Sequence, residues 1–183
     1  NVVWLRSVTD EEYRGAKRGC ETMIIPPQNK LRLQFLARMV RKEMCYLQTT
    51  DQRLFDVPFT REKAERLEKE VDLAERVDAF VSRFGRLQDT VGDKLLPNYL
   101  NAVGETTGPA VDNLNRAEKL GLINSAEIWM ALRDLRNQMV HEYMEDPDKL
   151  AEALNKGHEH VSTLTADATR ILVDLEARGW IAS

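Results

Sequence analysis

Apolar residues recur at helical spacing along most of this chain, and the regularity stops at a few breaks that contain proline or glycine. The first break is Pro26-Pro27, and later ones include residues 56–59, 104–109 and 146–147. An apolar residue every three or four positions gives a helix one buried face, whereas a half-buried strand needs a period of two. No alternating segment of useful length and no internal repeat is present. The sequence therefore predicts an all-α fold, an antiparallel helical bundle of about five to six helices.

Local signals place several helix ends. Thr60 suits the N-cap of a helix that begins at Arg61, and Asn124 or Ser125 suits the N-cap of a helix that begins at residue 126. Gly121 is expected to end the preceding helix by adopting a positive φ. The predicted helices cover residues 29–47, 61–91, 95–103, 107–120 (capped by Thr106 or Thr107), 126–144 and 148–177, with an interruption at Gly92 and Pro97.

Length and composition exclude several classes of protein. The 183 residues suit one domain, since a single core commonly serves about 100–200 residues. No apolar run approaches the roughly 18 residues of a membrane span, and no stretch reads as a signal peptide. Cys20 and Cys45 are far apart, which excludes a disulfide scaffold and a zinc finger and favours the reducing cytoplasm. The net charge of −4 argues against a broad coating of nucleic acid but leaves room for a local basic cleft.

The beginning of the chain differs from the rest. Residues 1–27 mix apolar and charged stretches with weak periodicity, and they are interpreted as an N-terminal arm or extension with no assigned role. Residues 28–183 are predicted to form the helical bundle domain.

The most informative segment is the helix expected at residues 128–144. At about 100° per residue, Ile128, Leu132, Leu135 and Met139 fall on one stripe and are predicted to face the core. The arc beside this stripe carries Arg133, Arg136, Asn137, Val140, His141, Tyr143 and Met144, together with Trp129.

This arc combines cations, an amide, an imidazole and a phenol with large apolar side chains, which is unusual for a solvated face. One interpretation is a cleft or interface, in which apolar contacts exclude water while the polar groups act on a ligand. The other is a satisfied polar seam between helices, with Arg136 paired to a carboxylate and His141 capping a carbonyl.

The segment Arg136-Asn137-Gln-Met-Val-His141-Glu-Tyr143 resembles the Arg-x4-His motif of HEPN domains, and its extension to Arg-x4-His-x-Tyr is similar to HepT-like toxins of HEPN–MNT toxin–antitoxin pairs. The motif stands near the C-terminal end of a helix, before an acidic turn and a last helix. Residues 80–96 are more loosely similar to an early bundle helix of such proteins, and the resemblance covers about residues 28–178.

The resemblance implies a metal-independent endoribonuclease that needs no cofactor. Arg136 would stabilise the negative charge of the transition state with its planar fork, and His141 would act as general base or acid. Asn137 would orient the imidazole or the phosphate, and Arg133 would line the substrate cleft. The resemblance also implies a homodimer that brings two motif helices together. The apolar residues Trp129, Val140 and Met144 give a separate reason to expect self-association on this arc.

Tyr143 is, by the same resemblance, the residue to which a nucleotidyltransferase (MNT) antitoxin attaches AMP, which silences the RNase. The alternative interpretation of Tyr143 is an aromatic residue at the rim of the arc, with its hydroxyl in contact with water. Two other functions stay open. One is a non-catalytic HEPN-type accessory subunit that binds a nucleotidyltransferase or its substrate. The other is a structural helical adaptor with a polar interface.

Other candidate residues are interpreted as structural. His158 and His160 are expected at the surface, and Cys45 in the core. Arg38, Arg41 and Lys42 are expected on a solvated face. Arg83, Arg86 and Asp89 are expected to form an intrahelical ion-pair ladder, with a line of approach for RNA as the alternative for the two arginines.

Overall fold

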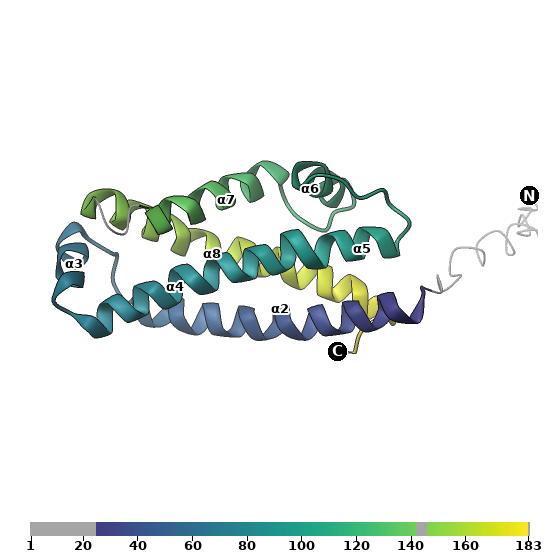
Figure 1. The fold of residues 1–183 in the computed structure, drawn as a ribbon, viewed down its shortest axis with the longest axis horizontal. Helices are drawn as coiled ribbons and strands as arrows, with labels where there is room; N and C mark the ends of the chain where they lie inside the picture. Colours follow the sequence, from purple (N-terminus) through teal and green to yellow (C-terminus); the bar gives the residue numbers. More distant parts are fainter. Residues whose placement is uncertain (1–24, 142–145, 183) are drawn as a thin grey trace, which may run out of the picture.

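The computed structural model describes residues 25–141 and 146–182, with the backbone alone for His141. Within these ranges the chain is helical and contains no strand, so the predicted all-α class is confirmed (Figure 1). If α4, η3 and α5 are taken as one continuous rod, the described residues form six helical units. The elements are α2 (Pro27–Leu54), α3 (Arg61–Glu65) with the 3₁₀ turn η2 (Arg66–Glu68), α4 (Val71–Asp89), the π-helical turn η3 (Thr90–Leu95), α5 (Leu96–Ala102), α6 (Ala110–Lys119), α7 (Ala126–His141) and α8 (Pro147–Ala177).

Four long units run alternately in opposite directions, which makes the bundle antiparallel as predicted (Figure 1). α2 packs on α4, α4 on α7, α7 on α8, and α8 returns to α2. The short α3 packs on α8 at one end of the bundle, and α6 packs on α5 and α7 toward the other. The central core consists of side chains with almost no exposed surface, among them Leu33, Val40, Leu47, Phe80, Phe84, Leu132, Met139, Leu164 and Ile171.

Three of the predicted helix ends are confirmed. The Thr60 hydroxyl accepts a hydrogen bond from the Lys63 backbone N–H (3.2 Å), and the Ser125 hydroxyl accepts one from the Ile128 N–H (3.2 Å). Gly121 follows α6 with a φ of 71°, where glycine avoids the strain that a Cβ would cause.

The start of α6 was predicted wrongly, because the helix begins at Ala110 and not after Thr106 or Thr107. The Asn113 side chain accepts from the Gly108 N–H (2.9 Å) and donates to the Gly108 carbonyl (2.8 Å). This pair of bonds fixes the turn before Pro109 and sets the first helical residue.

The predicted single helix over residues 61–91 is also wrong, because the chain leaves the helix at Lys69 and Glu70. Its first part, α3, packs on α8, whereas α4 packs on α2 and α7, so the chain must change direction between them.

The predicted interruption at Gly92 and Pro97 is absent, and the chain stays helical from Val71 to Ala102. The wider turn of η3 stands directly before Pro97, which has no backbone N–H to donate. Gly92 packs against Trp129, where an added Cβ would lie 3.4 Å from Cζ3 of the indole. Glycine is therefore used here for close helix packing and not to end a helix.

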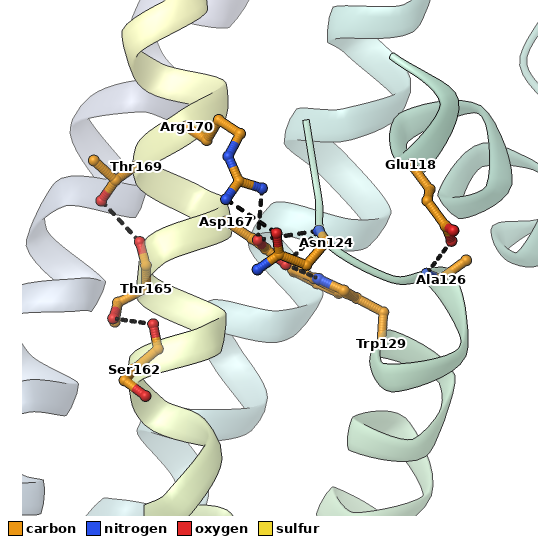
Figure 2. A network of polar contacts seen from close by, with 9 residues as sticks. All are labelled: Glu118, Asn124, Ala126, Trp129, Ser162, Thr165, Asp167, Thr169 and Arg170. Carbon is orange, nitrogen blue, oxygen red and sulfur yellow. Dashed lines mark hydrogen bonds and ion pairs between the residues drawn. The ribbon is translucent and has the colours of Figure 1, made fainter. Parts of the chain in front are cut away.

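Trp129 belongs to the core, which corrects its assignment to an interface. Its side chain is buried, and its indole N–H donates to a carboxylate oxygen of Asp167 on α8 (2.9 Å; Figure 2). Asp167 has no exposed surface and also accepts from the Asn124 backbone N–H (3.3 Å) and from Arg170 (3.0 Å). This network joins the start of α7 to α8. The buried indole is therefore not available for contact with a second chain.

The exposed face of α2 holds more apolar surface than its periodicity predicted. Leu31, Phe35 and Met39 are exposed, because the helix turns Leu33, Leu36, Val40 and Leu47 toward the core. Cys45 is exposed, so its predicted core position is wrong. Arg38 and Lys42 lie on the solvated face as predicted, whereas Arg41 is held by Glu176 and the Ala182 carbonyl.

His158 lies at the surface as predicted, but it is not free. Its ring stacks on Phe55 with centroids 4.4 Å apart, and its Nδ1 lies 2.7 Å from a carboxylate oxygen of Asp51. His160 is half-buried on the same helix, which differs from the surface position expected for it.

Candidate functional site

The motif helix α7 presents the predicted core stripe to the bundle. Leu132, Leu135 and Met139 are buried, and Ile128 is half-buried at its edge. The polar residues of the arc therefore lie beside the core, on the side of α7 that meets α4 and η3. Of the arc, the His141 side chain, Tyr143 and Met144 lie outside the described residues.

Arg136 lies flat against α4 at Gly85. A Cβ on Gly85 would lie 3.0 Å from Nε and 3.1 Å from Cγ of the arginine, so only glycine leaves full room for this side chain. One Nη of the guanidinium donates to the Asn137 side-chain oxygen (3.2 Å), and the other lies 3.8 Å from a carboxylate oxygen of Asp89. The side chain stays 41% exposed, which leaves part of the fork open to a ligand.

Asn137 is exposed and bonds to Arg136, so its contact in this structure is with the arginine. The pair of adjacent residues holds the guanidinium from one side, while Asp89 approaches it from the other.

Arg133 is engaged more fully. Its two terminal nitrogens donate to both carboxylate oxygens of Asp93 on η3, at 2.6 and 3.2 Å. These bonds raise the pKa of the Arg133 guanidinium, which was already charged at any physiological pH. A bidentate pair of this kind matches the polar-seam interpretation for Arg133, whereas the looser contact of Arg136 leaves it free to act.

A hollow of about 300 Å³ opens beside Arg136 between α4, η3 and α7, and it is named here the α4–α7 hollow. Its lining includes Gly85, Arg86, Asp89, Lys94, Arg136 and Val140. Val140 is 49% exposed at its rim.

The ion-pair ladder predicted for Arg83, Arg86 and Asp89 does not form. Arg83 donates to the Thr50 hydroxyl and the Tyr46 carbonyl on α2, and Asp89 approaches Arg136. Arg86 donates to the Ser82 hydroxyl at 3.1 Å and lines the hollow. The helix is turned by its packing between α2 and α7, so the three side chains meet different neighbours.

Sequence reasoning missed two residues of this region. Lys94 lines the hollow, and no sequence signal marked it, because eight positions in a regular α-helix separate it from Arg86 by about 80° around the axis. Glu43 on α2 is buried behind it, and only its position among apolar residues hinted at burial.

The Glu43 carboxyl is unusual because neither of its oxygens makes a hydrogen bond. Burial raises its pKa above the ordinary value of 4.5, and the nearby Thr90 hydroxyl and the charges of Arg86 and Lys94 offset this in part. A buried acid without a partner is uncommon, and such groups concentrate where function overrides stability.

Larger hollows lie away from the motif, and two of them have about twice the volume of the α4–α7 hollow. One, of about 690 Å³ between α2 and α8, includes Asp51, His158 and Ser162, and the other, of about 640 Å³, is lined by residues of α2, η2 and α4. Across residues 25–141 and 146–182 no three His, Cys, Asp or Glu side chains gather closely enough to hold a metal ion. In the same residues no helix is both long and apolar enough to cross a membrane.

No family model, no curated protein and no solved structure matches this chain. The resemblance to HEPN domains therefore depends on the motif residues 136–143 and their position in an all-α bundle.

Proposed function

We propose that this protein is a metal-independent endoribonuclease, the HepT-like toxin of a HEPN–MNT toxin–antitoxin pair in the cytoplasm. The observation that carries the proposal is the setting of Arg136. Its guanidinium is held against Gly85, half-exposed at the α4–α7 hollow, five residues before His141 on the same helix.

In the proposed reaction His141 removes the proton of a ribose 2′-OH, and the 2′-oxygen attacks the adjacent phosphorus. The bond from phosphorus to the 5′-oxygen breaks, and that oxygen receives a proton. Arg136 stabilises the charge that gathers on the nonbridging oxygens. The products are a 2′,3′-cyclic phosphate and a 5′-hydroxyl, and no step uses a metal ion.

A homodimer supplies the second acid or base in this proposal. Val140 supports it as an exposed apolar residue at the rim of the hollow, and Trp129 no longer contributes, because it is buried in its own chain. Val140→Asp should shift the dimer to a monomer, because it would bring two carboxylates together in a desolvated interface. Light scattering tests this, and a Val140→Asp variant that stays dimeric places the interface elsewhere.

Arg136→Ala and His141→Ala test the catalytic role directly. The full chain, incubated with total RNA in EDTA, should cleave it, and each variant should lose at least about 100-fold in rate. Arg38→Ala is a matched control, since it removes an exposed arginine from another helix. Equal cleavage by the wild type and His141→Ala would show a contaminating nuclease.

Tyr143 is proposed as the control point. Tyr143→Phe keeps the ring but removes the hydroxyl that would accept AMP. It should cleave RNA at a rate close to that of the wild type and escape the partner transferase. Intact-mass spectrometry after co-expression should show one added AMP group on the wild type and none on the variant. Equal neutralisation of both, with no added mass, would mean inhibition by binding alone.

A second function, the non-catalytic accessory subunit, has one observation in its favour. Carboxylates approach both arginines of the arc, Arg133 at 2.6 Å and Arg136 at 3.8 Å, as a satisfied seam would require. This function predicts a stable complex with a nucleotidyltransferase and no RNA cleavage by the purified chain.

A further inference from the structure

The α4–α7 hollow has a second wall that the motif does not supply. Arg86 on α4 and Lys94 on η3 both line it, and both are exposed. Among the described residues neither makes an ion pair, and Arg86 donates only to the Ser82 hydroxyl. The two cations are therefore available to a ligand.

The π-helical turn brings these two residues into line. In a regular α-helix, eight residues rotate the side chain by about 80° beyond two full turns. The i→i+5 bonding of η3 reduces the rotation to about 82° per residue from Thr90 onward. With this ideal geometry Lys94 would stand about 10° from Arg86 around the axis, which agrees with both side chains lining the same hollow. Turns of this kind are frequent at functional sites.

The charges of the hollow favour an anion. Three cations line it, namely Arg86, Lys94 and Arg136, against the single carboxylate of Asp89 among its described lining residues. The hydroxyls of Ser82 and Thr90 add two groups that can donate hydrogen bonds. A positive site of this kind is local, since the whole chain carries −4.

The buried carboxyl of Glu43, behind the hollow, also agrees with a site for an anion. It lies near Arg86, Lys94 and Thr90 but makes no hydrogen bond to them, and it is 93% buried (7% exposed). If it formed close ion pairs with the two cations, they would be withdrawn from the surface. Without such pairs, both cationic side chains stay exposed at the hollow.

We propose that Arg86 and Lys94 bind a backbone phosphate of a single RNA strand, next to the phosphate that Arg136 contacts. The inference deepens the proposed ribonuclease function and rests on it for the identity of the strand. It assigns Arg86 and Lys94 to substrate binding and not to the chemical step.

The test uses the full chain and a 2′-O-methyl oligoribonucleotide, which carries the phosphates but lacks the attacking hydroxyl. Fluorescence anisotropy over a range of salt concentrations should show that Arg86→Ala and Lys94→Ala each weaken binding about 3- to 10-fold. Each should also lower the slope of log K against log salt by about 0.7. Arg38→Ala should change neither quantity. All three side chains, Arg86, Lys94 and Arg38, are exposed, and circular dichroism checks that helicity is kept.

A variant expected to strengthen oligonucleotide binding gives a second test. Asp89→Asn removes the carboxylate that competes with phosphate, so it should strengthen binding of the same oligonucleotide about 3- to 10-fold. In cleavage assays Arg86→Ala and Lys94→Ala should raise KM with kcat within about twofold of the wild type.

The outcomes separate this inference from the ribonuclease proposal. Cleavage that needs Arg136 and His141, with oligonucleotide binding unchanged in Arg86→Ala and Lys94→Ala, would overturn the phosphate site and keep the ribonuclease. Binding that needs Arg86 and Lys94 in a chain that cleaves no RNA would keep the phosphate site and overturn the ribonuclease. Equal weakening by Arg38→Ala would mean diffuse charge and would overturn the site.

Discussion

Asp167 and Glu43 are both buried acids of this bundle, and their surroundings are opposite. Asp167 accepts hydrogen bonds from an indole, a backbone N–H and an arginine (Figure 2). Glu43 has cations near it but no hydrogen bond to either oxygen. Burial of a charge is tolerated when the group is paired and bonded, and it is costly otherwise. Asp167 therefore stabilises the packing of α7 on α8, whereas Glu43 costs stability.

The position of each acid explains the difference. Asp167 joins α8 to the loop before α7 and to Trp129, and its network is complete. Glu43 lies behind the hollow, where the motif arginine, a π-helical turn and two cations without an ion pair among the described residues meet. A cost in stability that is confined to such a place suggests that this region is arranged for binding.

Asp167→Ala has the largest expected effect. It leaves the buried Trp129 N–H without a partner, removes an acceptor of the Asn124 N–H, and should lower the free energy of unfolding by about 3 kcal/mol. Urea unfolding measures this. Asp134→Ala, an exposed acid on α7, is the control and should change stability by less than about 0.5 kcal/mol. A small effect of Asp167→Ala would remove the contrast between the two acids.

Glu43→Leu should change stability in the opposite direction. It replaces an unbonded buried carboxyl with an apolar side chain of similar size and should stabilise the fold by about 1–2 kcal/mol at neutral pH. Thermal unfolding tests the sign. Destabilisation by this variant would mean that Glu43 has a bonded partner and resembles Asp167 after all.

The pH dependence should identify Glu43 as the costly group. Its pKa is raised in the folded chain, so the native state holds the proton more tightly than the unfolded state does. At pH well below 4.5 the carboxyl is protonated in both states, and its ionisation costs no stability. This cost in the free energy of unfolding grows as the pH rises from there through the raised pKa. Glu43→Gln cannot ionise and should gain stability relative to the wild type over that window. If the difference in unfolding free energy between Glu43→Gln and the wild type did not change with pH, the burial of an ionisable group at this position would be contradicted.

Gly85→Ala should have the smallest effect on stability. The better helix propensity of alanine, worth about 0.5–1 kcal/mol, is offset by the contact of its Cβ with the flexible Arg136 side chain. Unfolding should change by less than about 0.5 kcal/mol, while RNA cleavage falls several-fold because the guanidinium is displaced. Unchanged cleavage would show that the position of Arg136 against α4 does not matter.

Much of this fold could be predicted from the sequence because its causes are local. The apolar spacing of residues 29–47, 126–144 and 148–177 placed three of the four long helices and their first residues to within two positions. The predicted end of the first helix was wrong, because α2 continues to Leu54. Thr60, Ser125 and Gly121 act on backbone groups of their own turns, so their roles are visible without the rest of the chain. The position of Arg136, Asn137 and Val140 beside the core stripe followed from the same periodicity.

Tertiary structure alone decided how the arc is used. Periodicity gives a residue its angle on a helix but not the neighbour it meets there. Asp167, 38 residues after Trp129, makes the indole a core residue, and Asp93, 40 residues before Arg133, occupies that guanidinium. The π-helical turn that brings Lys94 into line with Arg86, and the burial of Glu43 behind them, likewise depend on α2, α4 and α7 packing together. Such contacts join residues distant in the chain, and a helical pattern is the same whether or not they form.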